Sequence, residues 1–117
     1  MKRALLKLVL SAATVLAAGV AWGQDGFPSK PIRMISPFPA GGSVDLVARM
    51  IAARLPEFIG QQVVVENRSG ASGNIGTEVV ARAAPDGYTL LVNTIPFVAN
   101  AFLYNKLPYD PLNDFIP

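Results

Sequence analysis

Two segments of this chain repeat one pattern, in which a short apolar run leads into a glycine-rich turn and then into an amphipathic segment. The first two runs cover residues 32–36 and 62–66, and a third follows at residues 88–93. Runs with β-branched residues that stop at turn-forming residues are typical of strands. Alternating strands and helices with short links predict parallel strands joined by right-handed crossovers. The pattern therefore predicts an α/β fold, a βαβαβ parallel sheet with flanking helices.

This topology also predicts where a ligand would bind. Loops that begin near Pro37, Asn67 and Thr94 each follow a predicted strand. Because the strands are parallel, these loops should lie along one edge of the sheet, where open α/β sheets bind their ligands.

The first amphipathic segment predicts a helix from Ser43. Its apolar residues recur at helical spacing and are expected to face the core: Leu46, Val47, Met50, Ile51 and Leu55. Charged residues between them are expected to face solvent: Asp45, Arg49 and Arg54. Pro56 deletes an amide and crowds the preceding turn. The helix either ends near Leu55 or kinks and continues to Ile59 with Gly60 as its cap.

The rest of the chain gives shorter signals. The Val63-Val64-Val65 run is expected in a strand that is covered on both faces. Apolar residues from Ile75 to Ala83 predict a second helix that ends before a Pro-Asp-Gly turn. Residues 98–104 predict a short helix, and the remainder reads as extended and irregular.

The first 23 residues resemble a secretory signal. Three basic residues precede an apolar stretch at residues 8–20, and Ala21-Trp22-Gly23 supplies small residues for cleavage. A membrane anchor is the alternative, although the stretch is short for a span of about 20 residues. We expect cleavage after Gly23, export to a bacterial periplasm, and one domain from residue 24 to residue 117.

Composition excludes several classes of function. The chain has no cysteine and no histidine, which rules out disulfides and thiol chemistry and argues against a zinc site or a histidine-based triad. Removing the signal leaves seven basic against eight acidic residues, so the high calculated pI indicates no nucleic-acid partner. Without a histidine, no serine has an evident activating base. We expect no catalytic residues, no metal and no cofactor.

The first loop has the features of an anion-binding corner. Gly41 and Gly42 can bring the main chain close to a ligand, and Ser43 is a candidate N-cap at a helix N-terminus that favours negative charge. The glycines also suit a tight strand-to-helix connection. Asp45 also suits an ordinary role as an acidic residue in the first helical turn. Phe38 also suits a packing role in which it covers the end of the hydrophobic core.

The second loop, residues 70–76, has the spacing G-x-x-G-x-x-G. The dinucleotide fingerprint differs, because it is G-x-G-x-x-G after the first strand with an acid about 20 residues later. Hydroxyl and amide groups of Ser69, Ser72 and Asn74 can instead bond a carboxylate, while Asn67 and Arg68 also suit a solvated turn. Thr94 adds a hydroxyl at the third loop.

Five blocks of sequence, in order, resemble the Bug (TctC-like) family of extracytoplasmic solute receptors of tripartite tricarboxylate transporters. The blocks are PSKPIR at 28–33, PFPAGG with Asp45 at 37–45, VVVENR at 63–68, GASGNIG at 70–76 and PDGYTL at 85–90. The resemblance implies part of a non-catalytic clamshell receptor that captures a small carboxylated solute and presents it to a membrane permease.

The resemblance also implies ligand-binding residues. In the family the first two glycine loops hold a ligand carboxylate through amides, hydroxyls and bridging water. The candidates are Phe38, Ala40, Gly41, Gly42, Ser43 and Asp45 in the first loop, Ser69, Gly70, Ala71, Ser72 and Gly73 in the second, and Thr94 in the third.

Length is the main departure, because family members are much longer and include a second lobe. We therefore expect an N-terminal piece that contains most of lobe one, is monomeric and binds weakly or not at all alone. The alternatives are a nonfunctional truncated product and, from another class, an α/β enzyme domain that uses a nucleotide.

Overall fold

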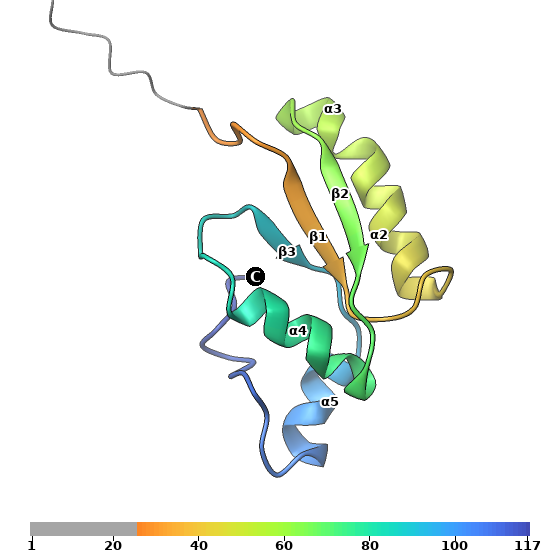
Figure 1. The fold of residues 1–117 in the computed structure, drawn as a ribbon, viewed down its shortest axis with the longest axis vertical. Helices are drawn as coiled ribbons and strands as arrows, with labels where there is room; N and C mark the ends of the chain where they lie inside the picture. Colours follow the sequence, from red (N-terminus) through yellow and green to blue (C-terminus); the bar gives the residue numbers. More distant parts are fainter. Residues whose placement is uncertain (1–25) are drawn as a thin grey trace, which may run out of the picture.

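The computed structural model describes residues 26–117, so the predicted signal peptide lies outside the described residues. Three strands form one parallel sheet in the order β2-β1-β3. They are β1 (Ile32–Ser36), β2 (Val63–Asn67) and β3 (Thr89–Leu91). The helices are α2 (Ser43–Arg54), α3 (Pro56–Ile59), α4 (Asn74–Ala81) and α5 (Pro96–Leu103), with a short turn of helix η1 at Ala71–Gly73. The predicted α/β class and its parallel sheet are confirmed (Figure 1).

Strand β1 is the centre of the fold because it pairs with both other strands. Ile32 is in register with Val63, and Met34 lies between Val65 and Leu90. Alternate residues of β1 point to opposite faces of the sheet. One face, with Ile32 and Met34, packs against α2 and α3, while the end of the opposite face packs against α4.

The orientation of α2 corrects the sequence-based assignment of its faces. Four of the five residues expected in the core are exposed: Leu46, Val47, Met50 and Ile51. The face toward the sheet instead contains Val44, Ala48 and Ala52, with Asp45 almost completely buried at its start. Ala48 is fully buried, which allows the helix backbone to lie close to the strands. Leu55 is half-buried against the same core, as expected.

Of the two possibilities at Pro56, the structure shows the kink. Leu55 keeps a helical backbone between α2 and α3, and Pro56 occupies the first position of α3, where a missing amide is tolerated. Gly60 then ends the helix with φ of 71°, the left-handed cap conformation.

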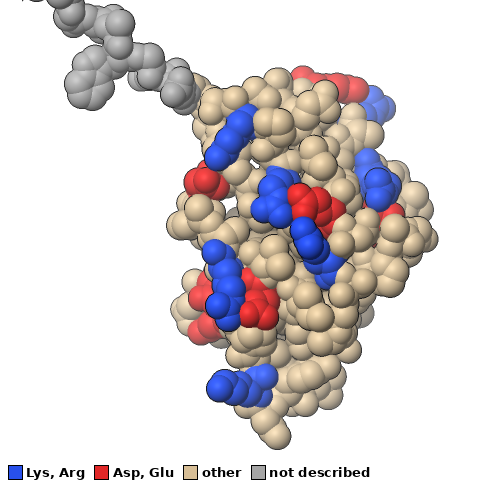
Figure 2. Space-filling view, in the orientation of Figure 1, with Lys and Arg blue, Asp and Glu red and all other residues tan. Residues whose placement is uncertain are grey.

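Strand β2 is an edge strand in the described part of the chain, and it is not covered on both faces. Val63 is buried in the core, whereas Val64 is 49% exposed on the other face. That face of the sheet carries the Arg33–Glu66 ion pair across β1 and β2, with Arg33 Nε 2.8 Å from Glu66 Oε1. Figure 2 shows basic and acidic side chains lying next to one another across the visible surface.

The C-terminal third differs from the sequence expectations mainly at its boundaries. Strand β3 is shorter than residues 88–93, and α5 begins at Pro96, two residues before the predicted start. Beyond α5, a segment without regular structure returns along α5 and α4 (Figure 1). Among the residues that the structure describes, no helix has the length and apolar character to cross a membrane.

Candidate functional site

Three loops leave the carboxyl ends of the strands at the same edge of the sheet, as the topology predicted (Figure 1). We call residues 37–42 the first loop, residues 68–73 the second loop and residues 92–95 the third loop. They follow β1, β2 and β3 respectively, and each leads to a helix or a helical turn. Whether these loops hold a ligand depends on how they are fixed and what they expose.

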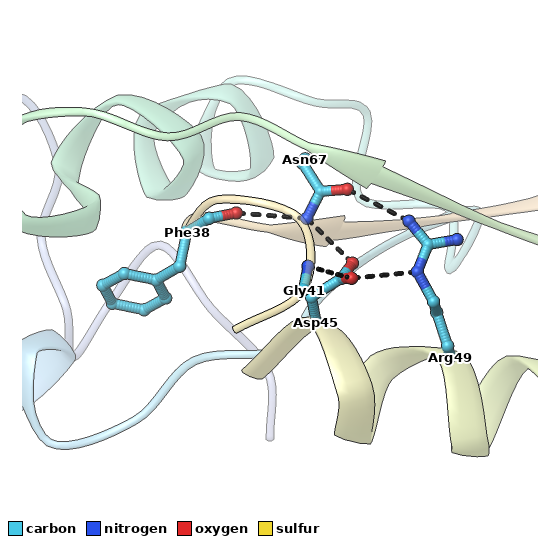
Figure 3. A network of polar contacts seen from close by, with 5 residues as sticks. All are labelled: Phe38, Gly41, Asp45, Arg49 and Asn67. Atoms are coloured by element: carbon cyan, nitrogen blue, oxygen red, sulfur yellow. Dashed lines mark hydrogen bonds and ion pairs between the residues drawn. The ribbon is translucent and has the colours of Figure 1, made fainter. Parts of the chain in front are cut away.

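The first loop is fixed by the carboxylate of Asp45 (Figure 3). The amide of Gly41 donates to Asp45 Oδ2 at 2.8 Å, and Arg49 Nε donates to the same oxygen at 2.9 Å. Asn67 Nδ2, at the end of β2, donates to Asp45 Oδ1 at 2.9 Å and to the carbonyl of Phe38 at 3.1 Å. Arg49 also donates to Asn67 Oδ1 at 3.3 Å. These contacts bind the first loop to both α2 and β2.

The same contacts keep Asp45 ionised. Its side chain is 4% exposed, and the hydrogen bonds from Arg49, Gly41 and Asn67 together lower its pKa to about 2 from an ordinary 3.8. The expected solvent-facing position of Asp45 is therefore wrong. Both carboxylate oxygens are already occupied by this chain, so Asp45 shapes the loop. Asn67 was not among the candidate residues, and its place at a strand end between two loops was the available signal.

The N-cap of α2 also differs from the expectation. Gly42 occupies that position, and no side chain caps the helix, so Ser43 is its first residue. Gly41 has φ of 83°, in the region that favours glycine, and this conformation turns its amide to Asp45. The first helical hydrogen bond runs from Leu46 N to Gly42 O. The amides of Ser43, Val44 and Asp45 come before it and therefore have no acceptor within the helix.

The first and second loops pack directly against one another. A Cβ built on Gly73 would lie 3.2 Å from Cζ of Phe38. A Cβ on Gly76 would lie 2.6 Å from the carbonyl oxygen of Arg68 and 2.8 Å from Cα of Pro37. A side chain at Gly76 would require the backbone to move, whereas a side chain at Gly73 would press on the Phe38 ring. The two glycines thus bring α4 and both loops together.

The second loop has an unusual backbone. Four consecutive residues, 70–73, have positive φ, including Ala71 at 48° and Ser72 at 54°. The amide of Gly73 donates to the carbonyl of Gly70 at 3.0 Å and closes the turn. Residues with a Cβ rarely adopt this conformation, and it tends to occur at functional sites. Helix α4 begins directly after this turn, with Gly73 as its N-cap.

The third loop is tied to the second by a chain of side-chain hydrogen bonds. Asn93 Nδ2 donates to Thr77 Oγ1 at 2.9 Å, and Thr77 Oγ1 donates to the carbonyl of Gly73 at 2.7 Å. The amide of Thr94 donates to Asn93 Oδ1 at 2.8 Å. Thr77 and Asn93 were not singled out from the sequence, because a buried threonine within a helix carries no pattern of its own.

Most of the predicted ligand residues are accessible. The exposed ones are Ala40, Gly41, Gly42 and Ser43 in the first loop and start of α2, Ser69, Ala71 and Ser72 in the second loop, and Thr94 in the third. Phe38 and Gly70 are half-buried, and Gly73 and Asp45 are buried. The rim therefore offers amides and hydroxyls, which suit an anionic oxygen. Among residues 26–117, no cluster of acidic side chains is arranged to hold a metal ion.

The parallel sheet with donor-rich loops at its carboxyl edge is that of a periplasmic binding-protein lobe. The family model described as the tripartite tricarboxylate transporter family receptor, TctC, matches residues 47–117. The chain belongs to this family. It is a family of binding proteins rather than enzymes, and the predicted resemblance is confirmed.

Related proteins agree with this assignment. A protein from Pseudomonas sp. strain P51, described as a UPF0065 protein in the tcbD-tcbE intergenic region, is 50% identical over 93 residues, which are 80% of this chain and 28% of that protein. The structure of the periplasmic binding protein BugD matches with a TM-score of 0.76 and 45% identity, covering 78% of this chain and 30% of BugD.

Two further structures contain a ligand. MatC from Rhodopseudomonas palustris with bound malate matches with a TM-score of 0.74 and 41% identity, over 78% of this chain and 31% of MatC. Another R. palustris protein, with adipate, matches with a TM-score of 0.70 and 43% identity, over 74% of this chain and 29% of that protein. The chain thus spans about a third or less of these relatives.

Proposed function

We propose that this chain forms part of the first lobe of a periplasmic receptor that captures a small dicarboxylate for a tripartite tricarboxylate-type transporter. The observation that carries this proposal is the convergence of three donor-bearing loops at one sheet edge. Two relatives with the same fold are described with the dicarboxylates malate and adipate. The natural partner of the complete receptor would be the permease of that transporter.

The charge arrangement of the first loop supports binding of an anion. The one carboxylate at this loop, Asp45, is buried and paired with Arg49, so the exposed rim presents little negative charge to an approaching acid. The amides of Ser43 and Val44 lie at the positive end of the α2 dipole, which favours a carboxylate. Ser43 and Ser72 contribute hydroxyls that can donate to the same group.

The N-terminal segment supports the cellular location. Residues 1–23 resemble a cleavable secretory signal, and relatives are described as periplasmic proteins. We infer export to the periplasm with cleavage near Gly23.

Titration of the purified chain with malate, followed by the amide signals of the three loops in NMR spectra, tests the proposal. One lobe leaves the ligand exposed to water on its far side, so we expect weak affinity, on the order of millimolar or weaker. Shifts should concentrate on the exposed loop residues, and the neutral diamide of malate should produce none. Absence of malate shifts at these loops, up to the solubility limit, would contradict the proposed site. Micromolar affinity would contradict the expectation that one lobe binds weakly.

A further inference from the structure

The second loop has a backbone conformation that needs support from its surroundings. Ala71 and Ser72 have φ of 48° and 54°, where a Cβ is unfavourable. Such residues persist only when neighbouring groups determine their conformation. The hydrogen bond from Gly73 to Gly70 closes the turn but lies within it. Outside the turn, the Thr77 hydroxyl holds the Gly73 carbonyl, and further support comes from the C-terminal part of the chain.

Two buried side chains from that part hold the loop. Asn100, on α5, donates from Nδ2 to the carbonyl of Ser72 at 3.0 Å and to Asn74 Oδ1 at 2.8 Å. The hydroxyl of Tyr109 donates to the same oxygen of Asn74 at 2.8 Å. Asn74 is the first residue of α4, directly after the loop. Asn74 Oδ1 therefore accepts two hydrogen bonds, and both anchor the turn to residues more than 25 positions later in the chain.

The position of Tyr109 is itself set by aromatic contacts. Its ring stacks on Phe97, with 6.2 Å between ring centroids, and meets Phe115 edge to face at 5.9 Å. Tyr109 is 6% exposed, and burial raises the pKa of its phenol, so the hydroxyl stays protonated as a donor. The aromatic cluster holds the returning segment against α5 independently of the hydroxyl.

We propose that Asn100 and Tyr109 form a clasp that fixes the second loop in its positive-φ conformation. Both are positioning residues, because they are buried and act through the Ser72 carbonyl and Asn74. The C-terminal segment thereby sets the direction of the Ala71 and Ser72 amides. The consequence for ligand capture rests on the proposed function, whereas the effect on loop conformation does not.

Two variants of the full chain separate the clasp from general stability. Tyr109→Phe removes the hydroxyl and leaves the ring to stack on Phe97, and Asn100→Leu removes both donated hydrogen bonds. Tyr88→Phe is the matched control. Its hydroxyl accepts a hydrogen bond from the Ser29 amide at 2.8 Å, and it precedes β3, at the sheet edge opposite the loops.

Positive φ brings the amide and Hα protons of a residue close together, so Ala71 and Ser72 should each show a strong intraresidue NOE. We expect Asn100→Leu to abolish or average this signature, Tyr109→Phe to weaken it, and Tyr88→Phe to leave it unchanged. Malate affinity of the folded protein should fall about tenfold in Asn100→Leu, which loses two hydrogen bonds, and about threefold in Tyr109→Phe, which loses one.

The clasp is overturned if Tyr109→Phe and the folded Asn100→Leu variant keep both NOEs, even if their thermal stability falls. If Asn100→Leu does not fold, Tyr109→Phe against Tyr88→Phe decides. If the proposed function is wrong, the wild-type chain will show no malate shifts. The NOEs of the variants will still show whether Asn100 and Tyr109 hold the loop, so the two failures can be told apart.

Discussion

At the scale of single residues, the loops are shaped by polar side chains that face inward. Asp45 lies between the first loop, α2 and β2, and accepts hydrogen bonds from all three. Arg49 balances its charge, and both of its oxygens accept hydrogen bonds, so no unpaired carboxylate faces the N-terminus of α2. The carboxylate of Asp45 is thus compatible with a neighbouring anion site, because hydrogen bonds within the protein already occupy it.

Asp45 predicts a loss of stability in acid. Its pKa is about 2 in the folded chain, below the ordinary 3.8, so the unfolded state takes up a proton first as the pH falls. The stabilisation by this group is complete above about pH 4 and is lost as the pH falls toward 2. We expect Asp45→Asn to lower the melting temperature near neutral pH and to make it less dependent on pH between 4 and 2.

Glu57→Gln is the control for that prediction, because the pair of Glu57 with Arg54 is exposed on both sides. It should leave the melting temperature and its acid dependence almost unchanged. Some acid dependence should survive in Asp45→Asn, since hydrogen bonds from Arg33 and Asn113 also lower the pKa values of Glu66 and Asp110. Identical melting curves for wild type and Asp45→Asn from pH 2 to pH 7 would show that Asp45 does not hold the loop.

A second residue-scale prediction concerns Gly76. Alanine within a helix gains about 1 kcal/mol over glycine. Here its Cβ would lie 2.6 Å from the Arg68 carbonyl oxygen and 2.8 Å from Pro37 Cα, both of them backbone atoms. Overpacking of this kind costs about 1–3 kcal/mol. We expect Gly76→Ala to destabilise the chain in urea unfolding despite the better helix propensity, whereas Gly26→Ala, with no atom within 4 Å of the added Cβ, should be neutral. Net stabilisation by Gly76→Ala would contradict the close packing of α4 on the loops.

At the scale of elements, order and type could be predicted from the sequence, but the facing of α2 could not. Strand, glycine turn and helix follow from local propensity and turn chemistry. Helix α2, however, carries apolar residues on more than one side, so periodicity alone wrongly predicted that Leu46 and Met50 face the core. The structure instead buries Ala48, because a small side chain brings the helix close to the sheet. The Asp45–Asn67 contact joins residues 22 positions apart and has no local signature.

Two alanines of α2 test this facing. Ala48 is fully buried against the sheet, and Ala53, five residues later, is exposed. We expect Ala48→Met to destabilise the chain by about 1–3 kcal/mol through overpacking, while Ala53→Met should stay within about 0.5 kcal/mol. Urea unfolding of both variants measures the difference. A larger loss of stability in Ala53→Met than in Ala48→Met would contradict the observed orientation of α2.

At the scale of the whole molecule, the described residues form one small sheet whose central strand, β1, pairs with both other strands. Strand β1 donates hydrogen bonds to each side, from Ile32 N to Gln62 O at 2.9 Å and from Arg33 N to Tyr88 O at 2.8 Å. Strand β2 lies at an edge, and α2 exposes Leu46 and Met50 to solvent. The chain covers about 30% of the length of its relatives.

This architecture predicts the order in which backbone amides exchange with solvent. Opening β1 requires both strand interfaces to break, and Met34 and Ile35 within it are almost fully buried. Opening β2 breaks only one strand interface, and one face of β2 is already half exposed at Val64. In native-state hydrogen exchange, the amides of Met34 and Ile35 should therefore exchange slowest, close to the rate set by global unfolding, and hydrogen-bonded amides of β2 should exchange faster. If β2 amides are protected as long as those of β1, then something covers the β2 edge in solution, and self-association through that edge becomes the explanation to test by sedimentation.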